Sequence, residues 1–408
     1  MKLTKIIALL LCSIFVCLTF AGCANKEGFT DYDWEAPVSI ELEFDLYIFV
    51  ENESGVADAD TVKAQKTVNS KINQYLKDKY NSVININYVH AKSVEDYQEE
   101  IRKMLSSDSQ TANGIISNSS NNIKAKGGTL VLITSEELHN ELVEAGKLVD
   151  LAPFLDTKDF GTLNIQIAST LIQAATVSEL VEDSEEVVNR LYCLPNNHVI
   201  GTYEYTVIDI AVAEGKYNFS ENELREMTIS DNNPETANDA AKELINLIET
   251  VGEDDWNKII YNVTGDFSDK KAYEQRGEFG SVCNISQYPE ATKEDALSSG
   301  FGIFKSNAIS LEGKELLSAA DCEKRAMQIL YAINSNVDVR NLLQYGVENT
   351  HYTFTEDGKI VPTANNAYNM DLKYTGDIFK AYFFSDVWTK EMAESGALQN
   401  KESVYFGN

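Results

Sequence analysis

The fold class of this chain is decided by one stretch, Ser39-Ile40-Glu41-Leu42-Glu43-Phe44-Asp45-Leu46-Tyr47-Ile48-Phe49-Val50. Its first half alternates strictly between apolar and polar residues, and its second half is a continuous apolar run. This pattern is typical of a β-strand that enters a sheet covered on both faces. We therefore predict that the ordered part of the chain begins with such a strand.

The residues after this strand predict a helix, a second strand and a second helix. Val68, Ile72 and Leu76 recur at the spacing of one helix face, together with Tyr75. The segment 83–89 alternates as a strand, and Ser93 marks the start of a helix that runs to Leu105. Strand, helix, strand, helix indicates a parallel sheet with helices on its faces, and hence an α/β fold.

The same alternation continues further along the chain. Thr129–Ile133 is predicted to be a buried strand that leads into a helix over Glu136–Ala145, which Gly146 ends. The remaining expectations are a loose loop over 106–128, helical segments over 164–188 and 221–261, a strand that restarts at Tyr203, a short strand over 301–304, a long helix over 322–343 and a mostly helical segment over 374–396.

Composition and charge exclude some classes of partner. Apolar residues make up 43% of the chain, as in an ordinary globular protein, which excludes wholesale disorder. The formal net charge is -30. Because such a field repels phosphate backbones, nucleic acid is excluded as a partner.

The N-terminus has the layout of a secretory signal. Lys2 and Lys5 precede an uncharged stretch over 6–20, which is shorter than the ~20 residues of a membrane-spanning helix. The run Leu18-Thr19-Phe20-Ala21-Gly22-Cys23 resembles a bacterial lipoprotein signal. The resemblance implies that residues 1–22 are removed and that Cys23 receives a diacylglycerol with palmitate-type acyl chains. An ordinary signal whose cleavage site happens to abut a cysteine is the alternative.

The rest of the N-terminal region follows from this interpretation. Residues 23–37 are polar and without periodicity, and they read as a tether between the lipid and the fold. The mature protein is then expected on the outer face of the cell membrane, on the extracellular or periplasmic side. A diacyl anchor, and not basic residues, would hold it there.

The cysteines of the mature chain indicate neither a zinc site nor a disulfide framework. Cys193, Cys283 and Cys322 are widely spaced, and the chain contains no CxxC motif. We expect buried free thiols, since cysteine is among the most buried residue types. A bridge between one pair remains open in an oxidising compartment.

Three stretches, in this order, resemble the extracellular solute-binding lipoproteins of bacterial ABC importers, of the carbohydrate type (family 1-like). They are Thr134–Leu138 with Leu142–Leu155, Tyr192–Tyr205, and Asn341–Phe354. The resemblance implies a two-lobe, periplasmic-binding-protein-like α/β fold with hinge crossovers and a ligand cleft between the lobes. Lobe one would comprise residues 38–200 and 300–345, and lobe two residues 201–299 and 346–408. Pro195 and Gly201 lie where the first crossover is expected.

The function that the resemblance implies is capture of a sugar or oligosaccharide outside the cell and its delivery to ABC permease subunits in the membrane. Neither a cofactor nor a metal is expected. Sugar clefts use aromatic faces for rings and amides or carboxylates for hydroxyls. The candidate ligand-binding residues are Glu51, Asn52, Ser135, Glu136, Asn196, Asn197, His198, Tyr203, Tyr205 and Trp256.

Several of these candidates have an equally simple structural interpretation. Ser135 either presents a helix N-terminus to the ligand or only caps its own helix. The pair Asn196-Asn197 either binds hydroxyls or forms a turn after Pro195. One of Tyr203 and Tyr205 is expected to pack, and Trp256 fits a helix interface as well as a sugar ring.

Catalytic motifs do not support an enzyme. The chain has four histidines and lacks HExxH, GxSxG, a P-loop and a glycine-rich dinucleotide loop. Two alternatives to a transport function stay open. One is a secreted glycosidase, which would need two positioned carboxylates. The other is a surface adhesin or sensor without transport.

Overall fold

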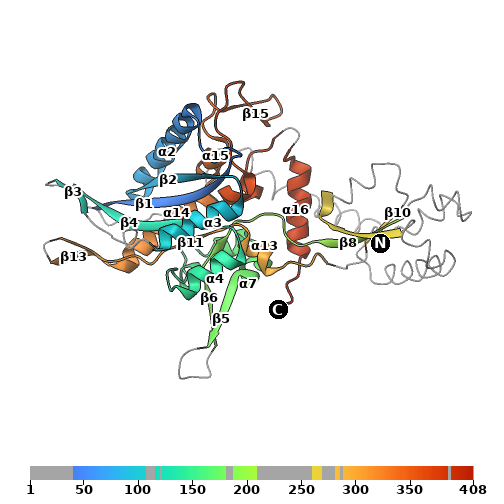
Figure 1. Ribbon diagram of the computed structural model, residues 1–408, viewed down its shortest axis with the longest axis horizontal. Coiled ribbons are helices and arrows are strands. Elements are labelled where there is room, and N and C mark those ends of the chain that lie inside the picture. The colour runs from blue at the N-terminus through green and yellow to red at the C-terminus, as the bar shows by residue number, and fades with distance from the viewer. Residues whose placement is uncertain are drawn as a thin grey trace, which may run out of the picture. The chain divides into compact units, whose positions relative to one another are not determined.

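The computed structural model describes residues 40–106, 115–119, 122–180, 187–208, 260–268, 281–284, 288–311, 313–384 and 387–407 (Figure 1). Cys23, the predicted tether and Trp256 lie outside these residues, as does nearly all of the segment 221–261. Within the described part of the chain, no helix combines the length and apolar character needed to cross a membrane.

A mixed sheet forms the centre of the structure, in the order β2-β1-β4-β11-β7 with β3 on β4. β1 (Ile40–Glu51) pairs in parallel with β2 (Ser82–Ala91) and with β4 (Asn122–Ile133). β11 (Gly300–Ile303) is antiparallel to both β4 and β7 (Leu194–Pro195), and β3 (Ile115–Ser119) is antiparallel to β4. The α/β fold class and the predicted strands 39–50, 83–89, 129–133 and 301–304 are confirmed.

The first strand is covered on both faces, as its pattern predicts. Leu42, Phe44, Leu46 and Ile48 are fully buried, and the intervening Glu41 is only 3% exposed. α2 (Ala59–Tyr80) packs on β2, α3 (Val94–Ser106) on β1 and β2, and α14 (Ala319–Ser335) on β4 and β11. Burial of apolar side chains between these helices and the central sheet is the main favourable contribution to the stability of this part of the fold.

Local signals start and end the first helix. The Asp58 carboxylate accepts a hydrogen bond from the backbone N–H of Thr61. Asn81, in the left-handed region at φ 48°, ends the helix and directs the chain into β2. Val68, Ile72 and Leu76 are at most 1% exposed, which confirms the predicted helix face.

The predicted long helix over 322–343 is wrong, because the chain forms two helices there. α14 ends at Ser335, and α15 (Val337–Tyr345) begins after Asn336. Asn336 has an extended backbone, with φ -91° and ψ 114°, and its side chain accepts a hydrogen bond from the N–H of Val339. An asparagine N-cap competes with a helix interior, so the break has a local cause.

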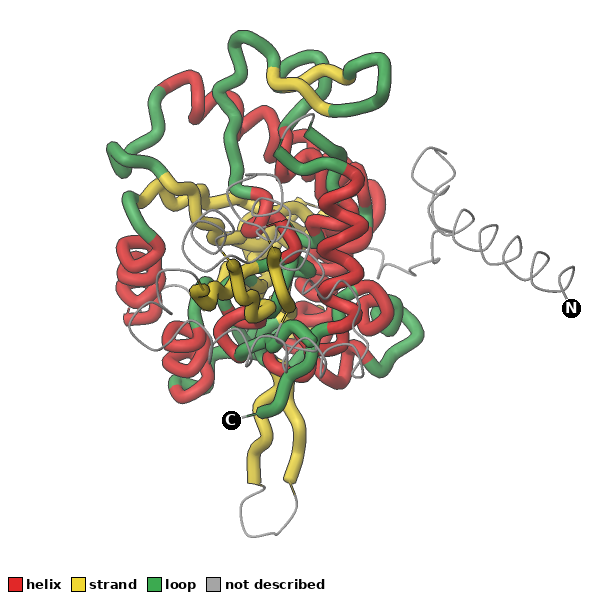
Figure 2. The backbone as a smooth tube through the Cα atoms, turned by 90° about the vertical axis from the view of Figure 1, so that its right-hand side faces the viewer, coloured by secondary structure: helices red, strands yellow, loops and turns green. Residues whose placement is uncertain are grey.

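The helical prediction over 164–188 is right only for its first part. α6 (Leu163–Gln166) and α7 (Ser169–Ala175) are followed by a hairpin of β5 (Thr176–Leu180) and β6 (Val187–Leu191). Figures 1 and 2 show this hairpin extending away from the helices. β-Branched residues at both strands favour the hairpin over a helix.

The loop predicted over 106–128 is wrong where the structure describes it. β4 begins at Asn122, seven residues before the predicted strand, and pairs with β1 from Ile40 onward. The glycines that suggested a loop fit a bulge instead. A Cβ on Gly127 would lie 2.5 Å from the ring of Phe44, and Gly128 has φ +146°.

The C-terminal segment is less helical than predicted. Among the described residues of 374–389, only the end of the 3-10 helix η2 (Leu372–Thr375) and the whole of η3 (Ile378–Lys380) are helical, and α16 (Lys390–Glu402) follows. The other described elements are short. They are α4 (Glu136–Glu144), α5 (Ala152–Leu155), α13 (Lys293–Leu297), the hairpin of β12 (Ile309–Leu311) with β13 (Lys314–Leu317), and the hairpin of β14 (Tyr352–Phe354) with β15 (Ile360–Pro362).

A second, antiparallel sheet has the order β10-β8-β9. β8 (Tyr203–Ile208), β9 (Ile260–Gly265) and β10 (Ser281–Asn284) form it, which confirms the strand predicted from Tyr203. Cys193 and Cys322 are buried free thiols, as expected. The side chain of Cys283, in β10, is not among those described.

Candidate functional site

The candidate site lies at one edge of the central sheet. The strands β1, β2, β4 and β7 run in the same direction, so their carboxyl ends meet at this edge. Binding sites of α/β sheets form at the carboxyl ends of parallel strands. Of the predicted residues, Glu51 ends β1 and Asn52 follows it, Ser135 and Glu136 follow β4, and Asn196 follows β7, so the fold brings these three groups to one edge.

Glu51 is exposed at this edge, and its charge acts on a tyrosine that the sequence did not suggest as a site residue. The ring of Tyr374, in η2, packs against the ring of Phe49 at 5.3 Å between centroids. Burial and the nearby carboxylates of Asp371, Glu51 and Glu95 raise the pKa of Tyr374 to about 12. Its hydroxyl therefore stays protonated beside carboxylates, an arrangement that suits hydrogen bonding to a solute hydroxyl.

Asn52, by contrast, uses its side chain within its own loop. Its Oδ1 accepts hydrogen bonds from the backbone N–H of Ser54 at 2.9 Å and from the Ser54 hydroxyl at 2.7 Å. Its Nδ2 donates to Val56 O at 3.2 Å. The structure thus gives Asn52 a turn-forming arrangement between β1 and α2.

Ser135 caps α4, in line with the structural interpretation left open above. Its Oγ accepts hydrogen bonds from the N–H of Leu138 at 3.1 Å and from Gln98 Nε2 at 3.0 Å. The adjacent N–H of Glu136 donates to Glu294 Oε2 at 3.0 Å. A carboxylate from another segment therefore satisfies the start of this helix, as expected at the positive end of a helix dipole.

Glu136 lines a hollow of about 250 Å³ beside this helix start. Its carboxylate lies 3.4 Å from Lys293 Nζ. The hollow lies between α4, the segment that leads into α13, and the C-terminal residues. Its other lining residues are Glu290, Ala291, Thr292, Glu294, Tyr405, Phe406 and Gly407.

Lys373 supplies a cation at the same edge. Its carbonyl accepts hydrogen bonds from Asn196 Nδ2 at 3.2 Å and from Ser299 Oγ at 2.6 Å, which fixes η2 against the ends of β7 and β11. Burial lowers the pKa of Lys373, although Asp371, Asp295 and Glu294 oppose the shift. Among the described residues, no carboxylate lies within ion-pair distance of its ammonium group.

The three residues after β7 are buried. Asn196, Asn197 and His198 are 0%, 6% and 7% exposed. Asn197 Nδ2 donates to Gln166 O at 2.9 Å and lies 3.3 Å from Asp377 Oδ2. His198 Nδ1 donates to Asn196 O at 2.7 Å. Their side chains hold neighbouring segments of this chain together, so any contact with a solute would require this network to open.

The next residues cross from the central sheet toward β8, and α16 fixes them. Gln399 Nε2 donates to Ile200 O at 2.9 Å and to Gly201 O at 2.7 Å. Asn400 accepts from the N–H of Ile200 at 2.9 Å and donates to His198 O at 2.6 Å. Two amide side chains thus satisfy a stretch of backbone that no sheet pairs.

Two further segments run beside this crossing. Thr202 and Glu290 exchange two backbone hydrogen bonds of 3.1 Å, and the N–H of Ala291 donates to Val404 O at 2.9 Å. Gly201 has φ +75°, and a Cβ there would lie 3.2 Å from Glu290 O. Glycine is required because both the backbone conformation and the close approach exclude a side chain. Two connections, near residues 201 and 290, therefore lie side by side, and the segment after α16 near residue 404 runs along the second of them.

The two predicted tyrosines of β8 differ in what the structure describes. Tyr203 is 9% exposed, and its hydroxyl lies 3.4 Å from Glu402 Oε2. Burial and Glu402 raise the pKa of Tyr203 to about 12. This is a packed position. Tyr205 pairs through its backbone with Val263 and Asn284, and its side chain is not described.

The sequence did not indicate Tyr374, Lys373 or Glu294 as site residues. Each reaches the edge from a segment more than 150 residues away from β1 and β4, with no local motif to mark it. Among the described residues, no group of three His, Cys, Asp or Glu side chains could hold a metal ion.

A pH test of the buried network follows from two opposed groups. Burial, with Lys373, lowers the pKa of His198 from 6.5 to about 4, and burial raises the pKa of Asp377 from 3.8 to about 6. As the pH falls from about 6 to 4.5, the unfolded chain binds a proton at His198 that the folded protein does not bind. This difference lowers the free energy of unfolding. Over the same interval the folded protein binds a proton at Asp377 that the unfolded chain does not bind, and this difference raises the free energy of unfolding.

The two effects should nearly cancel in the wild type, and single variants should separate them. Between pH 6 and 4.5, we expect the free energy of unfolding of Asp377→Asn to fall by about 2 kcal/mol more than that of the wild type. That of His198→Gln should rise by a similar amount. Urea unfolding at several pH values measures both. Equal pH profiles for all three proteins would contradict the burial of these groups.

Comparisons with known proteins give solved structures but no sequence relatives. No family model matches the chain, and no curated protein matches it. An N-glycan transport solute-binding protein from Streptococcus pneumoniae is 12% identical, with coverage of 90% of this chain and 83% of that chain and a TM-score of 0.49.

Two other solved structures have similar coverage. An extracellular solute-binding protein from Bifidobacterium longum subsp. infantis is 11% identical over 89% of this chain and 82% of that chain, with a TM-score of 0.38. An ABC substrate-binding protein from Listeria monocytogenes, in complex with cycloalternan, is 10% identical over 90% and 88%, with a TM-score of 0.32. All three are solute-binding proteins, the class that the sequence motifs resemble.

Proposed function

We propose that this protein is the substrate-binding lipoprotein of an ABC importer, which captures a sugar or oligosaccharide outside the cell and delivers it to the membrane permease. The observation that carries the proposal is the pair of chain connections between the central sheet and the β8–β10 sheet, near residues 201 and 290, which lie side by side with the segment after α16 near residue 404. Parallel connections of this kind allow two lobes to rotate about one hinge.

Capture by lobe closure requires that the solute contact both lobes only in the closed state. In this proposal the carboxyl edge of the central sheet is the lobe-one wall of the cleft. Glu51, Glu136, Lys373 and Tyr374 are its polar groups, because each is at least partly exposed there. The buried Asn196, Asn197 and His198 would position the hinge. Tyr205 and Trp256 remain the predicted contributions of lobe two, with the lobe boundaries given above.

The remaining parts of the proposal concern location and chemistry. Cys23 would carry a diacylglycerol and hold the protein on the outer face of the membrane. We propose no catalysis, since the predicted role is retention and release of an unchanged solute. A mixture of carboxylates, an ammonium group and a tyrosine suits the many hydroxyls of a carbohydrate, whose donors and acceptors must all be paired when buried.

Calorimetric screening of the soluble Ala24–Asn408 form against a panel of oligosaccharides and peptides tests the proposal. We expect saturable binding of at least one saccharide. With that saccharide, Glu51→Gln and Lys373→Met should each weaken affinity about tenfold or more, because a charged hydrogen bond is lost. Glu53→Gln is the matched control, since Glu53 is exposed two residues after Glu51, in the turn that follows β1, and it should bind like the wild type.

Three results would contradict the proposal. One is hydrolysis of a glycan by the purified protein, which would favour the glycosidase. Another is the absence of binding to every member of the panel, which would favour an adhesin or sensor. The third is peptide binding without saccharide binding, which would keep the transport function but change the solute.

A further inference from the structure

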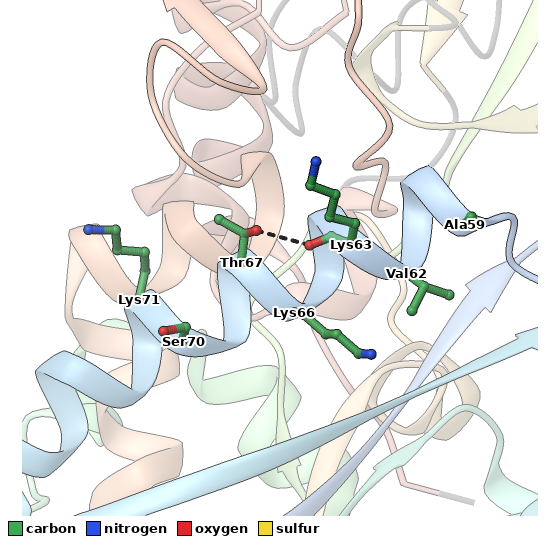
Figure 3. A pocket seen from close by; sticks show the side chains of 7 residues that line it. All are labelled: Ala59, Val62, Lys63, Lys66, Thr67, Ser70 and Lys71. Carbon is green, nitrogen blue, oxygen red and sulfur yellow. Dashed lines mark hydrogen bonds between the residues drawn. The ribbon is translucent and has the colours of Figure 1, made fainter.

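One helix carries an unusual charge for this chain. Between Asp60 and Asp78, α2 holds four lysines and no acidic residue, although the whole chain has 64 acidic and 34 basic residues. Lys63, Lys66 and Lys71 are exposed, and none of them forms an ion pair within the described part of the chain. They line a surface hollow of about 520 Å³ along the helix (Figure 3).

The other residues that line this hollow are small. They are Ala59, Val62, Thr67 and Ser70, of which Thr67 and Ser70 lie between Lys66 and Lys71, and Thr67 Oγ1 donates to Lys63 O at 2.9 Å (Figure 3). Protein interfaces are usually anchored by tryptophan, tyrosine or arginine, and lysine is depleted at their centres. A face of lysines without aromatic anchors instead suits a diffuse anionic surface.

The first described residue of the chain, Ile40, lies at the C-terminal end of the same helix. Asn81, which caps α2, donates through Nδ2 to Ile40 O at 3.0 Å. Lys77 and Lys124 both contact the buried Glu41, at 2.6 and 2.7 Å. Hydrogen bonds from these lysines outweigh burial and lower the pKa of Glu41, so the carboxylate stays charged. The first described residues therefore lie beside Lys77, on the helix that also carries Lys63, Lys66 and Lys71.

The length of the predicted tether and the charge of the lysine face together indicate what this face contacts. Residues 24–39, fully extended, span about 55 Å at most, and α2 is about 33 Å long. A lipid on Cys23 would hold α2 within this distance of the headgroups at a high effective concentration, so weak attraction per lysine suffices. We propose that the Lys63–Lys66–Lys71 face of α2 rests on anionic phosphate headgroups and orients the anchored protein. This inference rests on the lipid anchor of the proposed function.

The test uses the lipid-modified protein, purified from bacterial membranes and reconstituted in vesicles of phosphatidylcholine with or without phosphatidylglycerol. The readout is the rate at which a membrane-impermeant, amine-reactive reagent labels Lys77, followed by mass spectrometry. Lys77 has a half-exposed side chain on the same helix. We expect several-fold slower labelling on the anionic vesicles, and no difference between the two vesicles at high salt.

Charge-reversal variants separate the helix face from net charge. Lys63→Glu, Lys66→Glu and Lys71→Glu, made together, should abolish the protection of Lys77. The matched control reverses three exposed lysines elsewhere, Lys158, Lys305 and Lys314, and should keep it. Both triple variants change the net charge equally, so a loss of protection in both would contradict the assignment to α2.

The remaining outcomes are distinct. Absence of lipid on Cys23, seen in the same mass spectra, would contradict both the anchor and this inference. Lipid on Cys23 with equal labelling on both vesicles would contradict the inference alone. Protection that appears only when native membranes containing a permease are used would assign the face to a protein partner and overturn the headgroup proposal.

Discussion

Replacing Arg340 with leucine is expected to lower the free energy of unfolding by about 3–5 kcal/mol. Arg340 is fully buried, and its guanidinium donates from Nε to Asp377 O at 2.9 Å and from Nη2 to Leu372 O at 3.2 Å. Burial lowers the pKa of Arg340 to about 10, so it remains charged at neutral pH. Leucine would remove a charged hydrogen bond from each of two carbonyls and one of the two cations, with Lys380, that act on the buried Asp377.

A surface arginine provides the matched control for this prediction. Arg102 forms two hydrogen bonds with the Glu141 carboxylate, at 2.7 and 3.1 Å, but its side chain is 34% exposed. Exposed ion pairs contribute at most about 1 kcal/mol, so Arg102→Leu should have a small effect. Urea unfolding of the Ala24–Asn408 form compares the two. Equal losses of unfolding free energy in the two variants would contradict the larger contribution expected of the buried Arg340.

The second large effect is expected for Gly300→Ala, which should lower the free energy of unfolding by about 3 kcal/mol. Gly300 begins β11 opposite Pro195 of β7. A Cβ at this position would collide with Cys193 Sγ, and it would lie 2.8 Å from Leu194 O and 3.0 Å from Pro195 Cα. Because two of these obstacles are backbone atoms of the paired strand, the strands must separate to accommodate the methyl group.

Two companion variants sharpen the Gly300 measurement. Gly358→Ala tests a glycine with φ +81° and nothing within 4 Å of its Cβ, so it should cost only about 1 kcal/mol. Adding Cys193→Ala to Gly300→Ala removes the sulfur obstacle but keeps the backbone ones. Thermal unfolding should therefore show partial rescue at most. Full rescue, or a Gly300→Ala variant as stable as the wild type, would contradict the close packing of β7 on β11.

The sequence predicts the central sheet well because its strands are covered on both faces. The long apolar run around Ile48 and the helix spacing of Val68 and Ile72 reflect burial, and burial does not depend on knowing the neighbours. Errors arise where pairing decides the structure. The Gly127–Gly128 stretch is typical of a loop, yet a bulge opposite Phe44 accommodates it in β4.

The candidate site was predicted only in part. Glu51 and Ser135 were expected in the cleft loops that the resemblance implies, and Asn196 around the hinge; the structure brings the segments that hold them to one edge of the sheet. The structure adds hydrogen bonds that no spacing reveals, such as those from Gln399 to Ile200 O and Gly201 O, 198 residues or more away. Lys373 and Tyr374 reach the edge through such long-range contacts, so a single sequence gives no local signal for them.

Closure on a solute is the central claim, and small-angle X-ray scattering of the Ala24–Asn408 form tests it most directly. The measurement compares the radius of gyration of the free protein with that of the complex with the tightest saccharide from the calorimetric panel. A smaller radius in the complex is predicted, because the solute would bridge both lobes. Saturable saccharide binding with an unchanged radius of gyration would contradict capture by lobe closure.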